Sequence, residues 1–263
     1  MGRLHGQVAI MTGGGSGIGR SAAKMLAAEG AQVVVAGRRR EPLESVVREI
    51  EKDGGRAAAR ACDIAKPAEA EALACWTLAE LGRVDILVNN AGHSSKARSV
   101  RWVGLDEWNA VMNVNLTGVY VLTQAVLPGM LERGGGTIIT VASLAALKSS
   151  LVGGAPYGAA KAGARNLMNH VHNTLRDRGI RATTILPAEV DTPILDNRPK
   201  PPDAAGRATM MMAEDVAEAI VLCATLPPRT VIEEIIMSPT RQRDMVAELA
   251  VAAMSGAPAG AKP

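Results

Sequence analysis

The sequence predicts a single α/β domain with a doubly wound architecture, in which helices cover both faces of a parallel sheet. Two observations lead to this prediction. Short apolar runs alternate with segments of helical period along most of the 263 residues, which is typical of repeated strand–helix–strand units. One continuous sheet also accounts for all of these elements without a domain boundary, and a chain of this length can bury a sizeable core.

Seven segments are predicted as parallel strands because each is a short apolar run of strand length. They are Val8–Met11, Gln32–Ala36, Arg56–Ala61, Ile86–Asn89, Thr137–Val141, Ala182–Leu186 and Val231–Met237. Segments of helical length lie between them. These are Ser16–Glu29, Pro42–Asp53, Ala68–Leu81, Glu107–Arg133, Pro156–Arg178 and Ala213–Thr225.

Two segments depart from this alternation. The stretch 187–212 contains five prolines and little periodicity, so we expect it to be a substrate loop that leaves the sheet. Residues 251–263 are rich in Ala, Gly and Pro and are predicted to form a flexible tail. The dinucleotide-binding catalytic domain would then span residues 1–250.

Composition and charge exclude several classes of function. Hydrophobic residues make up 48% of the chain, and the net charge of +3 comes from interspersed basic and acidic residues, so no nucleic-acid partner is expected. No uninterrupted run of 18 apolar residues occurs, so no membrane partner is expected either. The three cysteines lack metal-ligand spacing and the four histidines form no metal constellation. Reduced thiols in the cytoplasm, with no metal, are the preferred interpretation.

Glycines follow the first predicted strand in the stretch TGGGSGIG, which opens the first predicted helix. Glycine lets the chain turn tightly and lets a pyrophosphate approach the backbone N–H groups at a helix N-terminus. The residues predicted to bind the dinucleotide here are Gly13, Ser16, Gly17, Ile18 and Gly19. A glycine-rich turn that merely joins two elements is the alternative that the motif alone leaves open.

The end of the second predicted strand indicates which dinucleotide binds. An acidic residue at this place binds the ribose of NAD, whereas arginine accommodates the 2′-phosphate of NADP. Here Gly37 is followed by Arg38, Arg39 and Arg40, with no carboxylate among them. The sequence therefore favours NADP, with Arg38 as the main phosphate contact, assisted by Ser16 and Arg39.

Further motifs stand at fixed intervals along the chain: NNAG at Asn89–Gly92, Asn115 on the fourth helix, Ser143 after a strand, and Tyr157 with Lys161. With the glycine-rich turn, this set resembles the short-chain dehydrogenase/reductase family, a group of Rossmann-type oxidoreductases that includes enzymes acting on an alcohol or carbonyl carbon. The resemblance runs from about Val8 to Met237. The chain end near MSPTRQRD also resembles a subgroup that contains 3-hydroxy acid dehydrogenases.

The resemblance implies a role for each matched residue. Tyr157 would be the acid/base, Lys161 would also bind the nicotinamide ribose, Ser143 would bind the substrate oxygen, and Asn115 would support a proton relay. The further cofactor contacts that it implies are Asp63, Ile64, Asn90, Ala91, Gly92, Pro187, Val190 and Thr192. It also implies a homo-oligomer, a tetramer or dimer, assembled through the fourth and fifth helices, where Val111, Val114 and Val121 serve either the interface or the core.

The chemistry of the pair follows from the side chains themselves. Tyr157 and Lys161 are four residues apart and share one face of a helix. A phenol has a pKa of about 10, and a nearby ammonium and an oxidised nicotinamide ring would lower it. Tyr157 is therefore predicted to donate or accept the proton while hydride moves between NADP and a small carbonyl or alcohol substrate.

Two other functions remain compatible with the sequence. One is a dinucleotide-sensing regulator without turnover, and the other is an isomerase or dehydratase that recycles bound NADP. The substrate is expected to lie among 93–96, 144–154 and the loop after Pro187, where Glu189, Lys148 and Arg101 are charged candidates. Ala188 stands where the family commonly has glycine, and would be strained if that position needs a positive φ.

Overall fold

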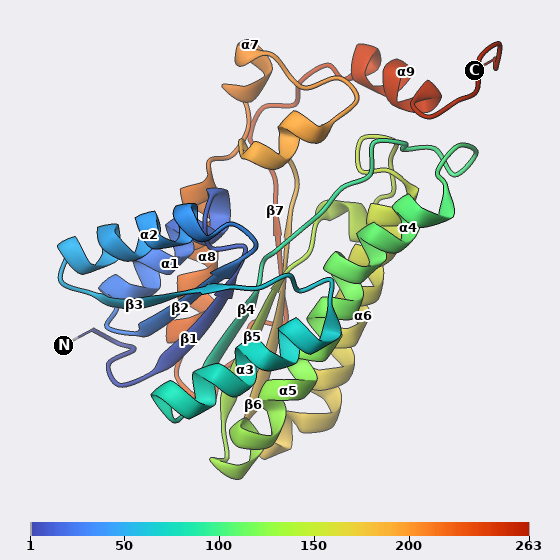
Figure 1. Cartoon of the computed structure of the whole chain (residues 1–263). Coiled ribbons are helices and arrows are strands. Elements are labelled where there is room, and N and C mark those ends of the chain that lie inside the picture. The colour runs from blue at the N-terminus through green and yellow to red at the C-terminus, as the bar shows by residue number, and fades with distance from the viewer. Residues whose placement is uncertain (1, 263) are drawn as a thin grey trace.

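The computed structural model describes residues 2–262 and contains the seven-stranded parallel sheet that the sequence predicts (Figure 1). The strands are β1 (Val8–Thr12), β2 (Gln32–Gly37), β3 (Arg56–Ala61), β4 (Ile86–Asn89), β5 (Gly136–Val141), β6 (Ile180–Pro187) and β7 (Glu234–Met237). The predicted bounds agree with these to within two residues, except that β7 begins three residues later than expected.

Helices connect the strands on both faces of the sheet. The long ones are α1 (Gly17–Ala28), α2 (Arg40–Lys52), α3 (Pro67–Leu81), α5 (Gly118–Glu132), α6 (Ala155–Leu175) and α8 (Ala213–Thr225). The shorter ones are α4 (Leu105–Met112), α7 (Ala204–Arg207) and α9 (Val246–Met254). Helices α1, α2 and α8 lie on one face, and α3, α5 and α6 on the other (Figure 1).

The strand order is β3-β2-β1-β4-β5-β6-β7, with every pair parallel. Strands β2 and β3 are added in turn on one side of β1, and β4 to β7 are added in turn on its other side. Ligands of open α/β sheets bind at such a reversal, beyond the carboxyl ends of the strands. The topology therefore places the expected site at the ends of β1 and β4.

Two apolar cores, one on each face, follow from the alternation of side chains along the strands. Met11 and Val35 pack with α1, α2 and α8, whereas their neighbours Ile10 and Val34 pack with α3 and α5. Because both faces are covered, the central strands are apolar throughout, and all five residues of β1 are buried.

The predicted fourth helix is one long helix, Leu105–Glu132, in which a π-helical turn at Asn113–Thr117 joins α4 to α5. By length and composition alone this helix of 28 residues is apolar enough to cross a membrane. It instead packs against α3 and α6 beside the sheet, and 44% of its most apolar window is buried. Val111 and Val121 belong to that buried part, which assigns these two side chains to the core.

The predicted loop and tail both contain more structure than the sequence indicated. Within 187–212, a 3₁₀ turn spans Pro193–Asn197, α7 follows, and Val190 pairs with Met211 in a parallel bridge. The tail was expected to start at residue 251, but α9 continues to Met254 because its Ala- and Leu-rich sequence favours helix. The Trp102 indole donates to the Ala253 carbonyl at 3.0 Å, which holds this end of the chain against the molecule.

Candidate active site

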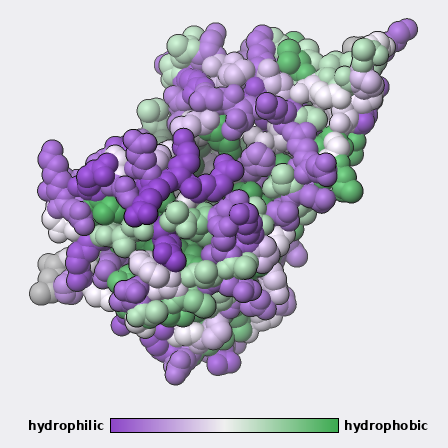
Figure 2. Space-filling view, viewed as in Figure 1, coloured by the Kyte–Doolittle hydropathy of each residue, from purple (hydrophilic) through white to green (hydrophobic). Residues whose placement is uncertain are grey.

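A cleft of about 300 Å³ opens beyond the carboxyl ends of the strands, where β1 and β4 are neighbours. Figure 2 shows a hollow on this side of the molecule, bordered by hydrophilic residues. Most of the predicted site residues line the cleft: Gly13, Ser16, Gly17, Ile18, Arg38, Arg39, Asp63, Ile64, Asn90, Ala91, Gly92, Ser143, Tyr157, Lys161, Pro187, Val190 and Thr192. Gly19 and Asn115 are the two predicted residues that stand behind the cleft wall.

The glycine-rich turn has the shape that the sequence predicted. Gly13 adopts a φ of +66°, which disfavours any residue with a Cβ. Gly19 is required by close approach, because a Cβ there would lie 2.3 Å from the Gly13 carbonyl oxygen. Gly19 therefore lets α1 pack against the turn, while Gly13 forms part of the cleft wall.

Thr12 joins this turn to the end of β4. Its hydroxyl accepts the backbone N–H groups of Asn90 and Ala91, at 2.9 and 3.1 Å, and donates to the Val88 carbonyl. In return, the Asn90 amide donates to the Thr12 carbonyl at 2.9 Å. The two strand ends that border the reversal are therefore held as one rigid unit. The sequence analysis did not predict these contacts of Thr12, although Thr12 is the first residue of the motif.

The N-terminus of α1 points its unpaired backbone donors toward the cleft. Ser16 is the N-cap residue, but its side chain makes no capping hydrogen bond, so the N–H groups of the first turn lack a side-chain partner. These donors and the helix dipole favour an anion. Together with the glycine wall, they fit the pyrophosphate of a dinucleotide.

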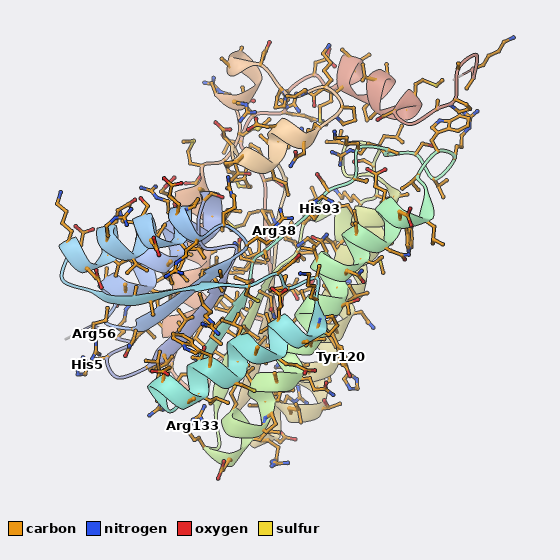
Figure 3. The ribbon with its side chains drawn as sticks, viewed as in Figure 1. His5, Arg38, Arg56, His93, Tyr120 and Arg133 are labelled. Atoms are coloured by element: carbon orange, nitrogen blue, oxygen red, sulfur yellow. The ribbon has the colours of Figure 1, made fainter. Side chains whose placement is uncertain are left out.

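The end of the cleft that lies beyond β2 and β3 is basic. Arg38 follows β2 and Arg39 is the N-cap of α2, and both line the cleft, as do Asp63 and Ile64 after β3. Arg38 and His93 lie near one another in the middle of Figure 3. Burial lowers the pKa of His93, and the positive charge of Arg38 lowers it further. A phosphate on the adenosine ribose would meet positive charge here.

Among residues 2–262, no cluster of His, Cys, Asp and Glu side chains is arranged to hold a metal ion.

Tyr157 and Lys161 lie on one face of α6, as their spacing predicts. The Lys161 Nζ is 5.6 Å from the centre of the Tyr157 ring and donates to the Val141 carbonyl at 2.8 Å. Ser143 follows β5 and caps the next turn, accepting the Ala145 N–H at 3.2 Å. Strand β5 and helix α6 thus bring the predicted serine, tyrosine and lysine to one wall of the cleft.

The electrostatics of the pair differ from the prediction. We expected Lys161 to lower the pKa of Tyr157, but burial raises it, against smaller opposing effects of the Ser143 hydrogen bond and the charges of Arg98 and Arg198. Burial also lowers the pKa of Lys161 to about 8. Burial outweighs these opposing effects, so the Tyr157 pKa shifts in the direction opposite to the expectation, which also counted on the charge of an oxidised nicotinamide ring.

Asn115 has a structural position rather than a place on the cleft wall. Its amide nitrogen donates to the carbonyls of Val111 and His93, at 2.8 and 2.7 Å, and its Oδ1 accepts the His93 N–H. Asn115 therefore holds the backbone of the segment after β4 from the side that faces away from the cleft.

A second cavity of about 480 Å³ adjoins the first. Ser143, Tyr157 and Ile194 line both, so the serine and tyrosine stand where the two cavities meet. Its walls come from the predicted regions after β4, β5 and β6, and also from the segment 238–245 after β7, which sequence reasoning missed. Its stretch MSPTRQRD was noted in the sequence only for its resemblance to a subgroup, and no local pattern places it in the wall of a cavity.

Ion pairs join that segment to the substrate loop. Arg243 binds Glu189 and Glu248, and Arg198 binds the same two carboxylates, with N···O distances from 2.5 to 3.3 Å. We call these four residues the Arg–Glu quartet. Glu189 was a candidate to attract a cationic substrate, but two arginines already neutralise it. The residue before it, Ala188, does not have a positive φ, so the strain considered for this position is absent.

Comparison with known proteins agrees with this geometry. A family model described as short chain dehydrogenase matches residues 7–203. A curated relative, an uncharacterized oxidoreductase of Staphylococcus aureus (strain USA300), is 32% identical over 242 residues, which cover 90% of this chain and 98% of the relative.

Solved structures show the same relationship. A metagenomic short-chain oxidoreductase in complex with NADP is 34% identical, with a TM-score of 0.79, and the match covers 91% of this chain and all of the other. A 3-ketoacyl-(acyl-carrier-protein) reductase from Brucella melitensis, complexed with NADH, is 31% identical, with a TM-score of 0.81 and coverages of 90% and 99%.

The chain belongs to the short-chain dehydrogenase family. It is accordingly an oxidoreductase that uses a nicotinamide dinucleotide, and the cleft at the carboxyl ends of the strands is where that dinucleotide fits.

Proposed function

We propose that the protein is an NADP-dependent reductase that converts a carbonyl group to an alcohol, with Tyr157 as the proton donor. The observation that carries this proposal is the position of Ser143 and Tyr157 at the junction of two cavities. A dinucleotide in the first cavity and a carbonyl compound in the second would meet at these two hydroxyl groups.

The chain's own residues would supply binding and proton transfer. When bound, NADPH supplies the hydride. Ser143 holds the substrate oxygen by a hydrogen bond, and Tyr157 protonates that oxygen as negative charge develops on it. Lys161 holds the nicotinamide ribose and provides positive charge next to the phenol. In the reverse direction Tyr157 accepts the proton, which requires its anion.

The raised pKa of Tyr157 supports reduction as the favoured direction. A phenol that stays protonated through neutral pH is ready to donate a proton, whereas oxidation of an alcohol needs the phenolate. Arg38 and Arg39 at the adenine end of the cleft support NADPH rather than NADH as the donor.

Replacing the phenolic hydroxyl tests the mechanism. Tyr157→Phe removes the proton donor and leaves the ring, so we expect kcat for carbonyl reduction to fall by at least about a hundredfold. The dissociation constant for NADPH, followed by its fluorescence, should change less than about threefold. Tyr120→Phe is the matched control, because the other tyrosine is partly exposed on α5 and lines neither cavity.

The same assay distinguishes the other functions. Net oxidation of NADPH over many turnovers with excess substrate is expected for a reductase only. An isomerase or dehydratase would leave the NADPH absorbance constant while converting substrate, and a sensing protein would bind NADPH without conversion. Near-normal reduction by Tyr157→Phe would contradict the role assigned to this residue.

A further inference from the structure

Basic side chains dominate the second cavity, where the substrate is proposed to bind. Five of its lining residues are basic and only one is acidic: Arg98, Lys148, Arg198, Arg241 and Arg243 stand against Glu189. A cavity for an uncharged carbonyl compound does not need this imbalance. A ligand can bind only those basic side chains that are not already paired with a carboxylate.

Two of the three buried or half-buried arginines already have carboxylate partners. Arg198 and Arg243 share Glu189 and Glu248 within the Arg–Glu quartet, whose charges sum to zero. Each of their guanidinium groups therefore has acidic oxygens within hydrogen-bond reach. These two arginines shape the wall but contribute little free positive charge.

Arg98 is different. Its side chain is almost fully buried, with 2% of the residue exposed, and no carboxylate contacts it within the described part of the chain. Only Nη1 has a partner, the Gly153 carbonyl at 2.8 Å, whereas Nε and Nη2 are buried without any hydrogen bond. Burial lowers the pKa of Arg98 to about 10, so the group is still charged at neutral pH.

A buried charge with two unused donors is unfavourable unless something binds it. The Gly153 contact alone does not explain why an arginine stands here, because one neutral donor would suffice to hold that carbonyl. A planar carboxylate matches the donor geometry of a guanidinium group and would supply the missing acceptors.

We propose that Arg98 binds the carboxylate of the substrate, so that the enzyme reduces an oxo acid to a hydroxy acid. This proposal rests on the function proposed above. Tyr157 lines the same cavity as Arg98, so one small molecule can place its carbonyl at the tyrosine and its carboxylate at the arginine. Hydride from NADPH adds to the carbonyl carbon, the Tyr157 proton goes to the oxygen, and the carboxylate is unchanged.

The rim of the cavity fits an anion as well. Lys148 and Arg241 are exposed and have no ion-pair partner among residues 2–262. Positive charge at the mouth of a cleft raises the rate at which anions enter, and salt screens this effect. Lys148 and Arg241 would therefore attract the substrate, while Arg98 would hold it.

The kinetic test compares oxo acids with their methyl esters, which have the same carbonyl without the charge. The panel contains 2-, 3-, 4- and 5-oxo acids of four to six carbons. For the preferred acid we expect kcat/KM to exceed that of its ester at least tenfold. Arg98→Met should lower kcat/KM for the acid at least tenfold more than kcat/KM for the ester, which removes the preference, and Arg98→Lys should restore part of it.

Arg101→Met is the matched control. Arg101 stands three residues away and stacks on Trp102 with 4.4 Å between the guanidinium carbon and the ring centre, outside the cavity. It should leave the preference for the acid unchanged. Equal turnover of acids and esters by the wild type, or equal losses on both in Arg98→Met, would overturn the proposal.

A binding experiment keeps the proposal separate from catalysis. Straight-chain carboxylates of three to six carbons and the corresponding amides are titrated into the NADPH complex by calorimetry, with no reaction possible. We expect at least one carboxylate to bind tenfold tighter than its amide to the wild type and to Tyr157→Phe, but not to Arg98→Met. If this holds while neither an oxo acid nor an ester of the panel is reduced, the proposed function fails and the anion site stands. If no carboxylate outbinds its amide, the anion site fails.

Discussion

At the scale of single residues, the site combines two buried groups whose protonation is shifted in opposite senses. Burial raises the pKa of Tyr157 and lowers that of Lys161, and in each case it favours the uncharged form. The sequence predicts which two residues meet, because their spacing on a helix fixes that. It does not predict the sign of the Tyr157 shift, because desolvation depends on how the whole wall is packed.

The lowered pKa of Lys161 predicts how the activity depends on pH. Below about pH 8 the side chain is an ammonium and can bind the ribose, and above it the charge is lost. We expect kcat/KM for NADPH to fall as pH rises through about 8, with the pKa of Tyr157 too high to contribute there. A pH–rate profile that stays flat up to pH 10 would contradict this role for the Lys161 charge.

The cofactor preference is also decided by single side chains. Arg38→Asp replaces the expected partner of the 2′-phosphate with a repelling charge, so the ratio of NADPH to NADH affinity should fall at least about tenfold, equivalent to about 1.4 kcal/mol. Titration with both nucleotides measures it. Arg40→Asp is the control, because Arg40 pairs with Glu44 on α2 and does not line the cleft. Equal loss of both affinities would argue against a phosphate contact.

At the scale of elements, the turn between β1 and α1 carries the most sequence information. Its glycines are needed for backbone geometry, which the sequence shows directly. The contacts of Thr12 with Asn90 and Ala91 join residues nearly 80 positions apart, and no local pattern reveals them. The π-helical turn at Asn113–Thr117 was missed as well, and its Asn115 contacts the backbone of His93, 22 positions away.

Gly19→Ala tests the close packing of α1 on this turn. The added Cβ would lie 2.3 Å from the Gly13 oxygen, so the turn must move and its N–H groups must lose their alignment. We expect NADPH affinity to fall at least about tenfold and the melting temperature to fall by several degrees. Gly104→Ala is the control, since nothing lies within 4 Å of a Cβ there. If both variants bind NADPH equally well, the close approach has no role in binding.

At the scale of the whole molecule, the alternation of strands and helices predicts one parallel sheet with helices on both faces, whereas the strand order comes from the structure. The sequence predicted three of the segments that form the second cavity, but it predicted neither the part played by 238–245 nor how the charged side chains pair, because these segments come together only in the folded chain. Arg98, Arg198 and Arg243 lie in these segments, and their pairing with Glu189 and Glu248, or the lack of it for Arg98, depends on the folded chain. The cofactor cleft was visible because its residues form motifs.

Assembly into a homo-oligomer stays a proposal. The buried Val111 and Val121 serve the core, whereas Leu105 and Tyr120 on the same long helix are exposed, at 72% and 47%. Large side chains of this kind are available to a second copy of the chain, which supports contacts between subunits through this helix, the fourth of the predicted ones.

A crystal structure of the NADPH complex tests the central claim most directly, namely that Tyr157 meets the nicotinamide at the junction of the two cavities. The account predicts the nicotinamide ring next to the Tyr157 hydroxyl, the Lys161 ammonium at the ribose and the 2′-phosphate at Arg38. A nicotinamide bound away from this junction, or a Tyr157 hydroxyl held where it cannot reach the substrate side of the ring, would contradict it.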